Sequence, residues 1–258
     1  HHLLYPLSLL SMPGPAGGRD PDPAEWPAVT LIVAAYQEAR MMAEKIANIA
    51  ALDYPADRLR VRVHCDGSTD GTDAVARQAL SLLTDRGIDA RVIVHPANRG
   101  KIAVLNEAIA EAETPLVALS DASADLSANA LQAAARVMAD GGVGVVGGLY
   151  DCAENGTPGE RRYWMTQNRL RAAEAALGSP VGFSGAFHVF RRSAFRPLPA
   201  DTINDDFVLP MAIIAQGYRG VLHPAISVRE RERTRPGQEM ARRLRIGAGN
   251  LQQAVRLL

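Results

Sequence analysis

Polar residues that can bind ligands follow four apolar stretches of this sequence, at the points where strands are expected to end. They include the carboxylates of Asp66 and Asp121 and the amine of Lys101. The four segments read Tyr36-Gln37-Glu38, Asp66-Gly67-Ser68, Asn98-Arg99-Gly100-Lys101 and Ser120-Asp121-Ala122-Ser123. In an open parallel sheet, ligands bind outside the carboxyl ends of the strands, so these segments are predicted to meet at one rim.

Such a rim suits a nucleoside diphosphate. One carboxylate can accept hydrogen bonds from a base or ribose, and a second can hold Mg²⁺ or Mn²⁺, which prefer oxygen ligands. The ion would bridge two phosphates and neutralise the charge that builds on them as they leave. Lys101, at the expected start of a helix, adds a positive charge near them. Ordinary turn geometry is the alternative explanation for Asp66 and Asp121.

Two common nucleotide motifs are missing from these segments. The stretch that ends in Lys101 lacks the Gly-x-x-x-x-Gly-Lys-Ser/Thr spacing, which disfavours an ATPase. No Gly-x-Gly-x-x-Gly follows the first strand, which disfavours a dinucleotide-binding unit.

The elements that must position these residues alternate between strand-like and helix-like stretches. Strands are predicted at 29–36, 59–65, 90–95, 115–120 and 143–150. Helices are predicted at 39–52, 72–87, 100–112 and 127–142, the last with Ser127 as its N-cap. This alternation indicates an α/β fold with a mostly parallel sheet and helices on both faces. After residue 150 the pattern loosens, with helices predicted at 159–177, 204–217 and 237–258 and short strands within 180–195 and 218–230.

Composition sets broad limits on the class of protein. The chain has 258 residues, of which 47% are hydrophobic, enough for one large domain or two small ones. The formal net charge is +0, so bulk charge indicates no nucleic-acid partner. The two cysteines, Cys65 and Cys152, make no disulfide framework, and no apolar run approaches the ~20 residues of a membrane span.

Six blocks, in order, resemble those of glycosyltransferase family 2. They are AAYQEA at 34–39, DGSTDGT at 66–72, NRGKIAVLN at 98–106, SDAS at 120–123, SGAFHVFRR at 184–192 and NDDFVLPMAIIAQGYR at 204–219. The resemblance covers about residues 28 to 250 and implies an inverting enzyme. It also implies the GT-A fold, a Rossmann-like, mostly parallel sheet with a mixed subregion on the acceptor side.

The resemblance assigns a role to each matching residue of the nucleotide-binding half. Asp66 would contact the nucleoside, and Glu38 with the backbone around Ala35 would close over the base. Lys101 would lie near the nucleotide. Asp121 matches the first aspartate of the family's Asp-x-Asp, which touches the ribose and the metal.

The resemblance also assigns the catalytic base. Asp206 matches the aspartate that removes a proton from the acceptor hydroxyl, with Asp205 as its structural neighbour. The alternative is that both are helix N-terminal acids stabilised by the helix dipole. Ser123 stands where the second aspartate of Asp-x-Asp would be, and a hydroxyl is the poorer ligand for the metal. Either the metal affinity is reduced or Asp121 with water suffices.

The expected function is transfer of a sugar from a nucleotide diphosphate sugar, UDP-linked in the first instance. The acceptor would be the hydroxyl of a glycan or a lipid-linked molecule, in glycan or polysaccharide synthesis. Residues 242–246 match the Gln-x-x-Arg-Trp of processive synthases at Arg245 alone, which argues against processive polymerisation. One alternative is a non-catalytic nucleotide-sugar-binding module. The other is a nucleotidyltransferase, but AAYQEAR supplies no glycine- and arginine-rich loop for a triphosphate.

The expected organisation is a tether at 1–27, a GT-A domain at 28–236 and an amphipathic helix at 237–258. The domain would divide into a nucleotide-binding half, 28–126, and an acceptor and catalytic half, 127–236. The terminal helix carries an apolar stripe of Leu244, Ala248, Leu251, Val255 and Leu258. It is expected either to pack on the domain or to lie on a membrane surface. Many relatives flank this domain with membrane helices, so the cytoplasmic face of a membrane, or the cytoplasm, is the expected location.

Overall fold

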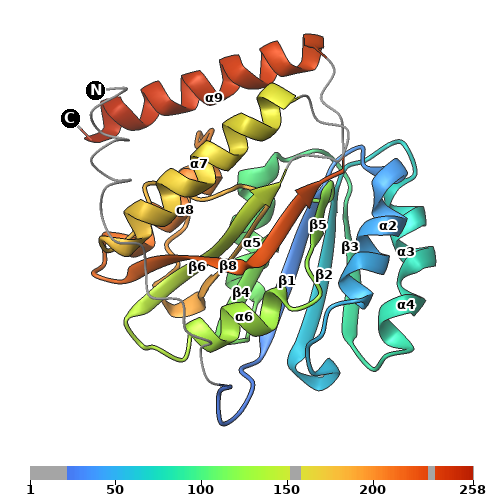
Figure 1. Cartoon of the computed structure of the whole chain (residues 1–258). Coiled ribbons are helices and arrows are strands. Elements are labelled where there is room, and N and C mark those ends of the chain that lie inside the picture. Colours follow the sequence, from blue (N-terminus) through green and yellow to red (C-terminus); the bar gives the residue numbers. More distant parts are fainter. Residues whose placement is uncertain (1–21, 152–157, 232–235, 258) are drawn as a thin grey trace.

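A single mixed sheet lies at the centre of the protein. The computed structural model describes residues 22–151, 158–231 and 236–257, so most of the predicted tether and Cys152 lie outside the described residues. The eight described strands lie in the order β3-β2-β1-β4-β7-β6-β8-β5 (Figure 1). This order places β1 and β4, which carry two of the predicted ligand-binding segments, next to each other in the middle of the sheet.

The first four strands of the sheet run parallel. They are β1 (Val29–Ala35), β2 (Leu59–Asp66), β3 (Asp89–His95) and β4 (Leu116–Ser120). β1 pairs with both β2 and β4, and β2 pairs with β3. The continuous apolar run of β1 is typical of a parallel strand that is covered on both faces. All four predicted strands are confirmed, and their carboxyl ends share one edge.

The other half of the sheet is mixed, as the family resemblance implied. β7 (Phe187–Arg191) runs antiparallel to both β4 and β6 (Val143–Asp151). β8 (Arg219–Glu230) runs parallel to β6, and β5 (Ala124–Leu126) pairs antiparallel with β8. β5 was not predicted, because three residues are too few to show an alternating pattern.

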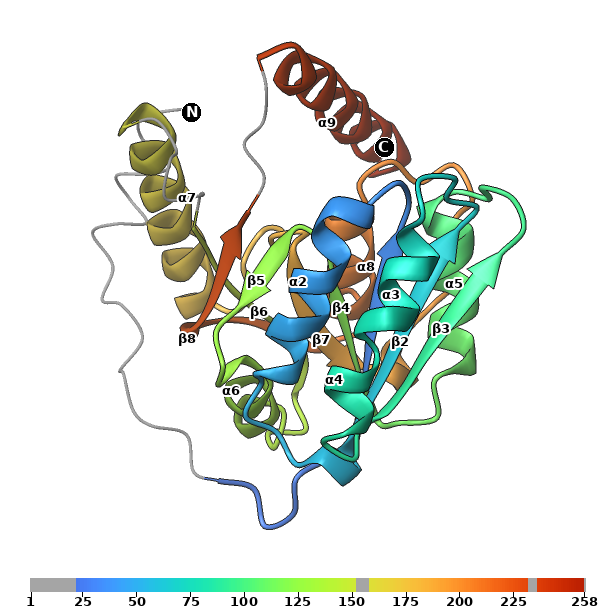
Figure 2. The same ribbon diagram turned by 90° about the vertical axis from the view of Figure 1, so that its right-hand side faces the viewer.

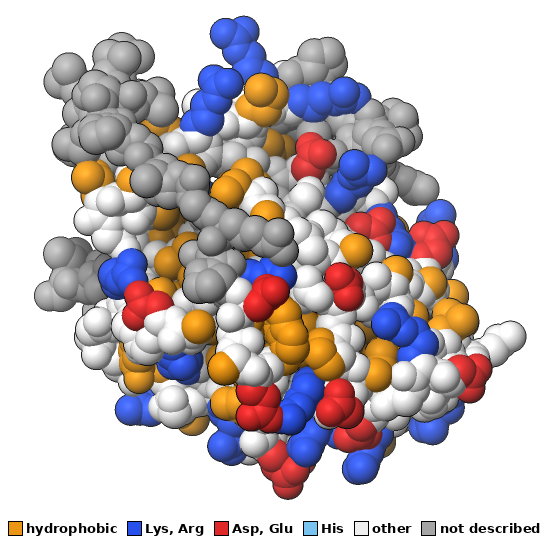
Figure 3. All heavy atoms as spheres, turned by 60° about the horizontal axis from the view of Figure 1, so that its bottom comes forward, with side chains coloured by type: hydrophobic (Ala, Val, Ile, Leu, Met, Phe, Trp, Pro, Cys, Tyr) orange, Lys and Arg blue, Asp and Glu red, His pale blue; other side chains and the backbone are white. Residues whose placement is uncertain are grey.

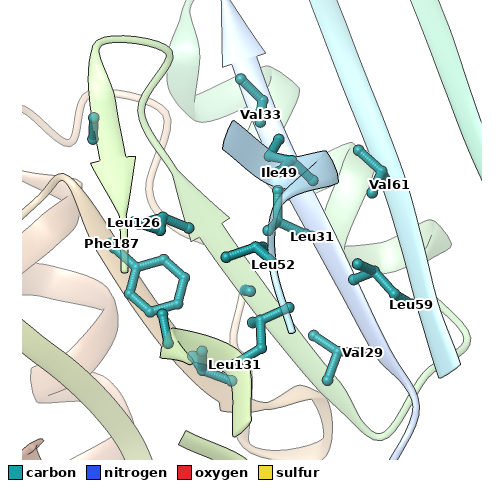
Figure 4. Close-up of a cluster of buried hydrophobic side chains, with 14 of the residues drawn as sticks. Val29, Leu31, Val33, Ile49, Leu52, Leu59, Val61, Leu126, Leu131 and Phe187 are labelled. Carbon is teal, nitrogen blue, oxygen red and sulfur yellow. The ribbon is translucent and has the colours of Figure 1, made fainter. Parts of the chain in front are cut away.

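Helices cover both faces of the sheet. One face is covered by α2 (Ala39–Ala50), α3 (Thr72–Ala79), α4 (Ser81–Thr84) and α6 (Ala130–Val137). The other is covered by α5 (Lys101–Glu111) and α8 (Asp205–Ile214). Figure 4 shows Leu31 of β1 and Ile49 of α2 pointing toward each other in the first of these cores. Burying each such side chain stabilises the fold by roughly 1.5–3 kcal/mol.

Two of the predicted helices differ from the observed ones. The helix expected at 72–87 is divided at Leu80, whose N–H donates to the carbonyl of Arg77 in a tighter turn. Ser127 is not an N-cap, since α6 begins at Ala130. Ser127 is used instead by the sheet: its N–H donates to the carbonyl of Ser227, and its hydroxyl accepts from the N–H of Ser227. Helix α6 therefore starts later than its sequence indicated.

Two long helices lie at the carboxyl end of the sheet. α7 (Pro158–Ala176) packs beside β6 and β8, and α9 (Pro236–Leu257) lies across the top of the molecule (Figures 1 and 2). No described helix is both long and apolar enough to cross a membrane. At the lower end of the molecule, acidic and basic side chains are interspersed (Figure 3), in keeping with the net charge of zero.

Candidate active site

A cavity of about 440 Å³ lies at the carboxyl end of the sheet, beneath α9. It is lined by the start of α5, the turn after β4, one face of α7, the segment before β7, the start of α8 and part of α9. Three of the predicted site residues, Lys101, Asp121 and Asp206, line this cavity together. They are distant in the sequence, and the strand order brings them to one place.

Lys101 joins two acidic segments at the edge of the cavity. Its Nζ atom lies 3.1 Å from Oδ1 of Asp121 and 3.1 Å from Oδ2 of Asp205. Desolvation would lower the pKa of Lys101, but it is limited because 42% of the side chain is exposed, and the charges of Asp121 and Asp205 raise the pKa above its ordinary value. Lys101 is therefore a cation. It lies at the N-terminus of α5, where the helix dipole also favours a negatively charged ligand.

Asp206 is the less constrained carboxylate of the pair at the start of α8. Asp205 is 7% exposed and bonded to Lys101, while Asp206 is more exposed and faces the cavity. Burial, followed by repulsion from Asp205 and Asp121, raises the pKa of Asp206 above its ordinary value. A Cβ atom at Gly185 would lie 3.0 Å from Oδ2 of Asp206, so a glycine there leaves room for the carboxylate.

His188 lies beneath this charged cluster. It lines a smaller cavity together with Lys101, Asp121 and Asp205 and is 1% exposed. Neither ring nitrogen has a hydrogen-bond partner among the described residues, and burial lowers the pKa of His188 to about 4. Its position under the cluster was not predicted.

Asp66 shapes the turn that precedes Lys101. It is 4% exposed, and its two carboxylate oxygens accept the backbone N–H groups of Arg99 and Gly100, each at 2.9 Å. Gly67 follows with φ +65°, and a Cβ atom there would lie 2.3 Å from the backbone nitrogen of Asn98. Asp66 is thus bonded within the fold. Its oxygens keep further lone pairs that a ligand can use.

The hydroxyl groups of the DGSTDGT block hold the neighbouring loop. The backbone N–H of Gln37 donates to the Ser68 hydroxyl at 3.1 Å, and the N–H of Glu38 donates to the Thr72 hydroxyl at 2.9 Å. The N–H of Ala39 donates to Asp70 at 3.0 Å. The first turn of a helix leaves several N–H groups without intrahelical partners. Residues 68–72 therefore satisfy the first N–H of α2, at Ala39, and the two N–H groups that directly precede the helix.

Ala35 and Glu38 belong to this pair of loops. Ala35 is the last residue of β1, Glu38 follows it, and Asp66 is the last residue of β2. None of the three is among the residues that line the cavity. The structure therefore brings together the residues expected to bind the diphosphate and the residue expected to act as catalytic base. The residues expected to contact the nucleoside lie at the ends of β1 and β2. Their predicted roles remain predictions.

Of the two predicted metal ligands, Asp121 alone reaches the cavity. Its side chain is 39% exposed and offers the carboxylate oxygens that Mg²⁺ and Mn²⁺ prefer. Ser123 does not line the cavity, and its carbonyl accepts the N–H of Arg231. Asp125 is bound by the guanidinium of Arg231. The Asp121 carboxylate could therefore hold a divalent ion, and the role of Ser123 stays a prediction.

A histidine pair lies on the far side of the Asp66 turn. Nδ1 of His64 lies 3.3 Å from Nε2 of His95, and the two rings are within 18° of parallel with centroids 5.5 Å apart. These values describe rings lying edge to edge and sharing a hydrogen bond. Glu107 is 4.0 Å from the other nitrogen of His95 and pairs with Arg99 at 2.7 Å. One candidate ligand atom from each of His64, His95 and Glu107 lies within 4.8 Å of the other two, so these residues form a second cluster that could hold a metal ion.

Helix α9 docks directly beside the predicted base. The side-chain amide of Asn204 donates to the carbonyl of Ile246 at 3.3 Å and to Oδ1 of Asn250 at 3.1 Å. The backbone N–H of Ile203 donates to the side chain of Gln252. These contacts bring Arg245, Ile246 and Asn250 into the cavity wall.

Sequence reasoning missed part of the cavity wall. Arg171 and Tyr150 line it, but neither belongs to a block that resembles the family. Tyr163 and Trp164 also line the cavity, and Trp164 packs against the core as well. Arg245 had one signal, its place in the RRLRI segment. The other wall residues depend on how α7 and α9 dock, which no local pattern records.

Comparisons with known proteins identify the family and the fold. The model of the family Glycosyl transferase family 2 matches residues 30–198, so the chain belongs to glycosyl transferase family 2. The predicted family is thereby confirmed.

The related proteins match different shares of this chain. The N-acetylglucosaminyltransferase of Mesorhizobium japonicum is 29% identical over 223 residues, which are 80% of this chain and 51% of that protein. The beta-monoglucosyldiacylglycerol synthase of Synechocystis sp. is 31% identical over 113 residues, 44% of this chain and 23% of that protein. The chain thus spans about half the length of the N-acetylglucosaminyltransferase that it matches.

Solved structures are similar in fold. The mannosyltransferase PcManGT of Pyrobaculum calidifontis, solved with GDP-Man and Mn²⁺, has a TM-score of 0.81 and 29% identity. The match covers 99% of this chain and 71% of that one. TarS of S. aureus has a TM-score of 0.56 at 18% identity over 78% of this chain and 60% of that one, which supports the fold alone. The predicted GT-A fold is confirmed.

Proposed function

We propose that this chain transfers a sugar, with inversion, from a nucleoside diphosphate sugar to an acceptor hydroxyl. The observation that carries the proposal is the convergence of Lys101, Asp121 and Asp206 on one cavity at the carboxyl end of the sheet. The GDP-Man and Mn²⁺ bound by the similar mannosyltransferase support a donor of this chemical class and a divalent ion.

Each of the three residues has a distinct task. Lys101 places a positive charge near the diphosphate, and Asp121 would hold Mg²⁺ or Mn²⁺, which neutralises the leaving phosphates when bound. Asp206 removes the proton from the acceptor hydroxyl. The hydroxyl oxygen forms a bond to the anomeric carbon while the bond from that carbon to the diphosphate breaks on the opposite side. The raised pKa of Asp206 makes its carboxylate a stronger base for this step.

The donor is proposed to be UDP-linked, and GDP is the second candidate because the mannosyltransferase holds GDP-Man. The test is calorimetry of UDP and of GDP, each with and without Mn²⁺. Wild type is compared with Asp121→Ala and with Asp57→Ala, an aspartate whose side chain is 79% exposed away from the cavity. Mn²⁺-dependent binding that Asp121→Ala loses and Asp57→Ala keeps supports the proposal. Absence of binding by wild type would overturn it.

A non-catalytic binding module is the alternative, and the position of Ser123 outside the cavity favours it. The two functions differ in turnover. An enzyme consumes labelled nucleotide sugar and releases the nucleoside diphosphate, whereas a binding module retains the intact sugar nucleotide. Release that disappears in Asp206→Asn identifies the enzyme.

We also propose that α9 contacts a membrane surface, which places the enzyme at the cytoplasmic face of a membrane, with a glycan or lipid-linked acceptor. Leu244, Leu251 and Val255 are 67%, 67% and 65% exposed, while the polar side of the helix docks on the domain. Arg256 of the same helix pairs with Asp201 of the domain, so the proposed membrane contact rests on the apolar stripe.

Sedimentation with vesicles of anionic phospholipid tests this contact. Leu251→Gln should lose binding, because the apolar area that enters the lipid is removed. The control is Leu82→Gln, since Leu82 is 47% exposed on α4, away from α9. Equal binding of both variants and wild type would contradict the membrane contact.

A further inference from the structure

Lys45 of α2 is buried behind the turn that carries Asp121. It is 0% exposed, although lysine is almost never fully buried unless it is paired. Its Nζ atom donates to the hydroxyl of Ser120 and to the carbonyl of Ala124, each at 2.6 Å. These two acceptors lie on either side of the segment from Asp121 to Ser123. The amine therefore bridges both ends of that segment.

The same segment is held from the other side by Arg231, the residue that follows β8. The backbone N–H of Arg231 donates to the carbonyl of Ser123 at 2.9 Å. Its guanidinium binds Asp125 and reaches Glu44 of α2 at 3.0 Å. Lys45 and Arg231 thus tie this segment and its flanks to α2 and to the end of β8, through bonds at Ser120, Ser123, Ala124 and Asp125.

A chain of hydrogen bonds through Ser120 and Ala186 links the Lys45 amine to Asp121. The Ser120 hydroxyl accepts from Lys45 and donates to the carbonyl of Ala186 at 3.2 Å. That carbonyl also accepts the backbone N–H of Asp121 at 3.1 Å. Burial lowers the pKa of Lys45 to about 7, against the attraction of Asp121 and Asp125. An amine keeps two N–H donors in either protonation state, so both bonds survive the loss of a proton.

We propose that Lys45 is a positioning residue that holds the Asp121–Ser123 turn in the shape that presents the Asp121 carboxylate to the diphosphate and its divalent ion. This inference rests on the function proposed above. Lys45 does not line the cavity, so it acts through the turn and touches no substrate. Without the amine, two buried acceptors lose their donor, and the turn is free to rearrange.

The chain provides a matched control on the same helix. Asn48 lies one turn further along α2 and makes two bonds of 2.9 Å, to the carbonyl and from the N–H of Leu126. Lys45→Met and Asn48→Ala therefore each remove two hydrogen bonds between α2 and the chain that follows β4. Only the first variant removes bonds that bracket Asp121. A merely structural role predicts similar behaviour of the two variants.

Hydrogen exchange and a Mn²⁺ titration of nucleotide binding test the proposal. In Lys45→Met, exchange should accelerate at the amides of residues 121–125, and the Mn²⁺ concentration for half-maximal UDP or GDP binding should rise about tenfold. In Asn48→Ala, the Mn²⁺ requirement should match that of wild type. Ser120→Ala, which removes one of the two acceptors and risks less of the fold, should give a smaller shift in the same direction.

Two results would overturn the proposal. One is an unchanged exchange rate at 121–125 in Lys45→Met or, should that variant not fold, in Ser120→Ala. The other is an equal rise of the Mn²⁺ requirement in Lys45→Met and Asn48→Ala. If wild type binds neither nucleotide, the proposed function fails by itself. The exchange comparison needs no ligand and still decides whether Lys45 holds the turn.

Discussion

Asn204 and Gly249 are in direct contact between the start of α8 and the middle of α9. A Cβ atom at Gly249 would lie 2.4 Å from the amide atoms of Asn204, a distance that real Cβ contacts do not show. Asn204 directly precedes the two aspartates of the site. The glycine therefore allows α9 to approach closely enough to form one wall of the cavity.

Substitution of this glycine is expected to move the wall. Gly249→Ala should push α9 outward and raise the KM for donor or acceptor several-fold, by removing Arg245 and Asn250 from the cavity. Gly247→Ala is the control, because a Cβ atom at Gly247 meets nothing within 4 Å. Both changes favour the helix by about 1 kcal/mol, so helix propensity cannot distinguish them. Equal KM values for the two variants would show that the close contact has no functional effect.

Asp206→Asn is expected to abolish transfer and to keep the fold. The amide cannot accept the acceptor's proton, whereas nucleotide binding, which depends on other residues, should persist. The variant should also melt at a higher temperature than wild type at pH 7, because it removes a carboxylate whose charge is disfavoured by burial and by Asp205. Thermal unfolding and donor turnover, measured on the same preparation, check both statements. Full turnover in the variant would remove Asp206 from the mechanism.

The pH dependence of transfer should reflect the raised pKa of Asp206. The base is the ionised carboxylate, so kcat/KM should rise with pH through a pKa above the ordinary aspartate value of about 3.9. Stability changes in the opposite direction. The folded state binds this proton more tightly than the unfolded chain, so the contribution of Asp206 to stability falls as pH rises between the two pKa values. Unfolding measured at several pH values should show that this decrease in stability is absent from Asp206→Asn, which would assign the decrease to Asp206. An acid limb at the ordinary value would contradict the assignment.

Asp66→Asn is expected to weaken both stability and nucleotide binding. One carboxylate oxygen becomes an NH₂ group facing the N–H of Arg99 or Gly100, which leaves a nearly buried donor unpaired at a cost of about 1–3 kcal/mol. The turn that delivers Lys101 should then loosen. Asp53→Asn, on an exposed loop residue, is a suitable control for the charge change. Urea unfolding and UDP calorimetry measure the two effects, and normal values for Asp66→Asn would show that the turn does not need this carboxylate.

The central strands and the rim were predictable from the sequence for a local reason. Apolar runs such as Val29 to Ala35 are typical of buried parallel strands, and the turn residues after them can be read without knowing the topology. Lys101, Asp121 and Asp206 were found through blocks of contiguous residues. Their meeting in one cavity required the strand order, which the βαβ rhythm and the family resemblance supplied.

The parts that escaped prediction depend on contacts between distant segments. Lys45 looks like an ordinary surface lysine of an amphipathic helix, and only the packing of α2 against the end of β4 shows it to be buried. Ser127 resembles an N-cap, but the pairing of its backbone with Ser227 decides its role. The wall formed by α9 depends on Gly249 and Asn204, which are 45 positions apart in the chain.

The bonds between the loops after β1 and β2 have a consequence for protein engineering. Gln37, Ser68 and Thr69 exchange hydrogen bonds, and Asp70 with Thr72 supplies acceptors for the start of α2. A chimera that imports residues 66–72 from a relative would leave the other loop without its partners. The two loops depend on each other's partners, so replacing either of them in this scaffold calls for segments 36–39 and 66–72 from the same parent.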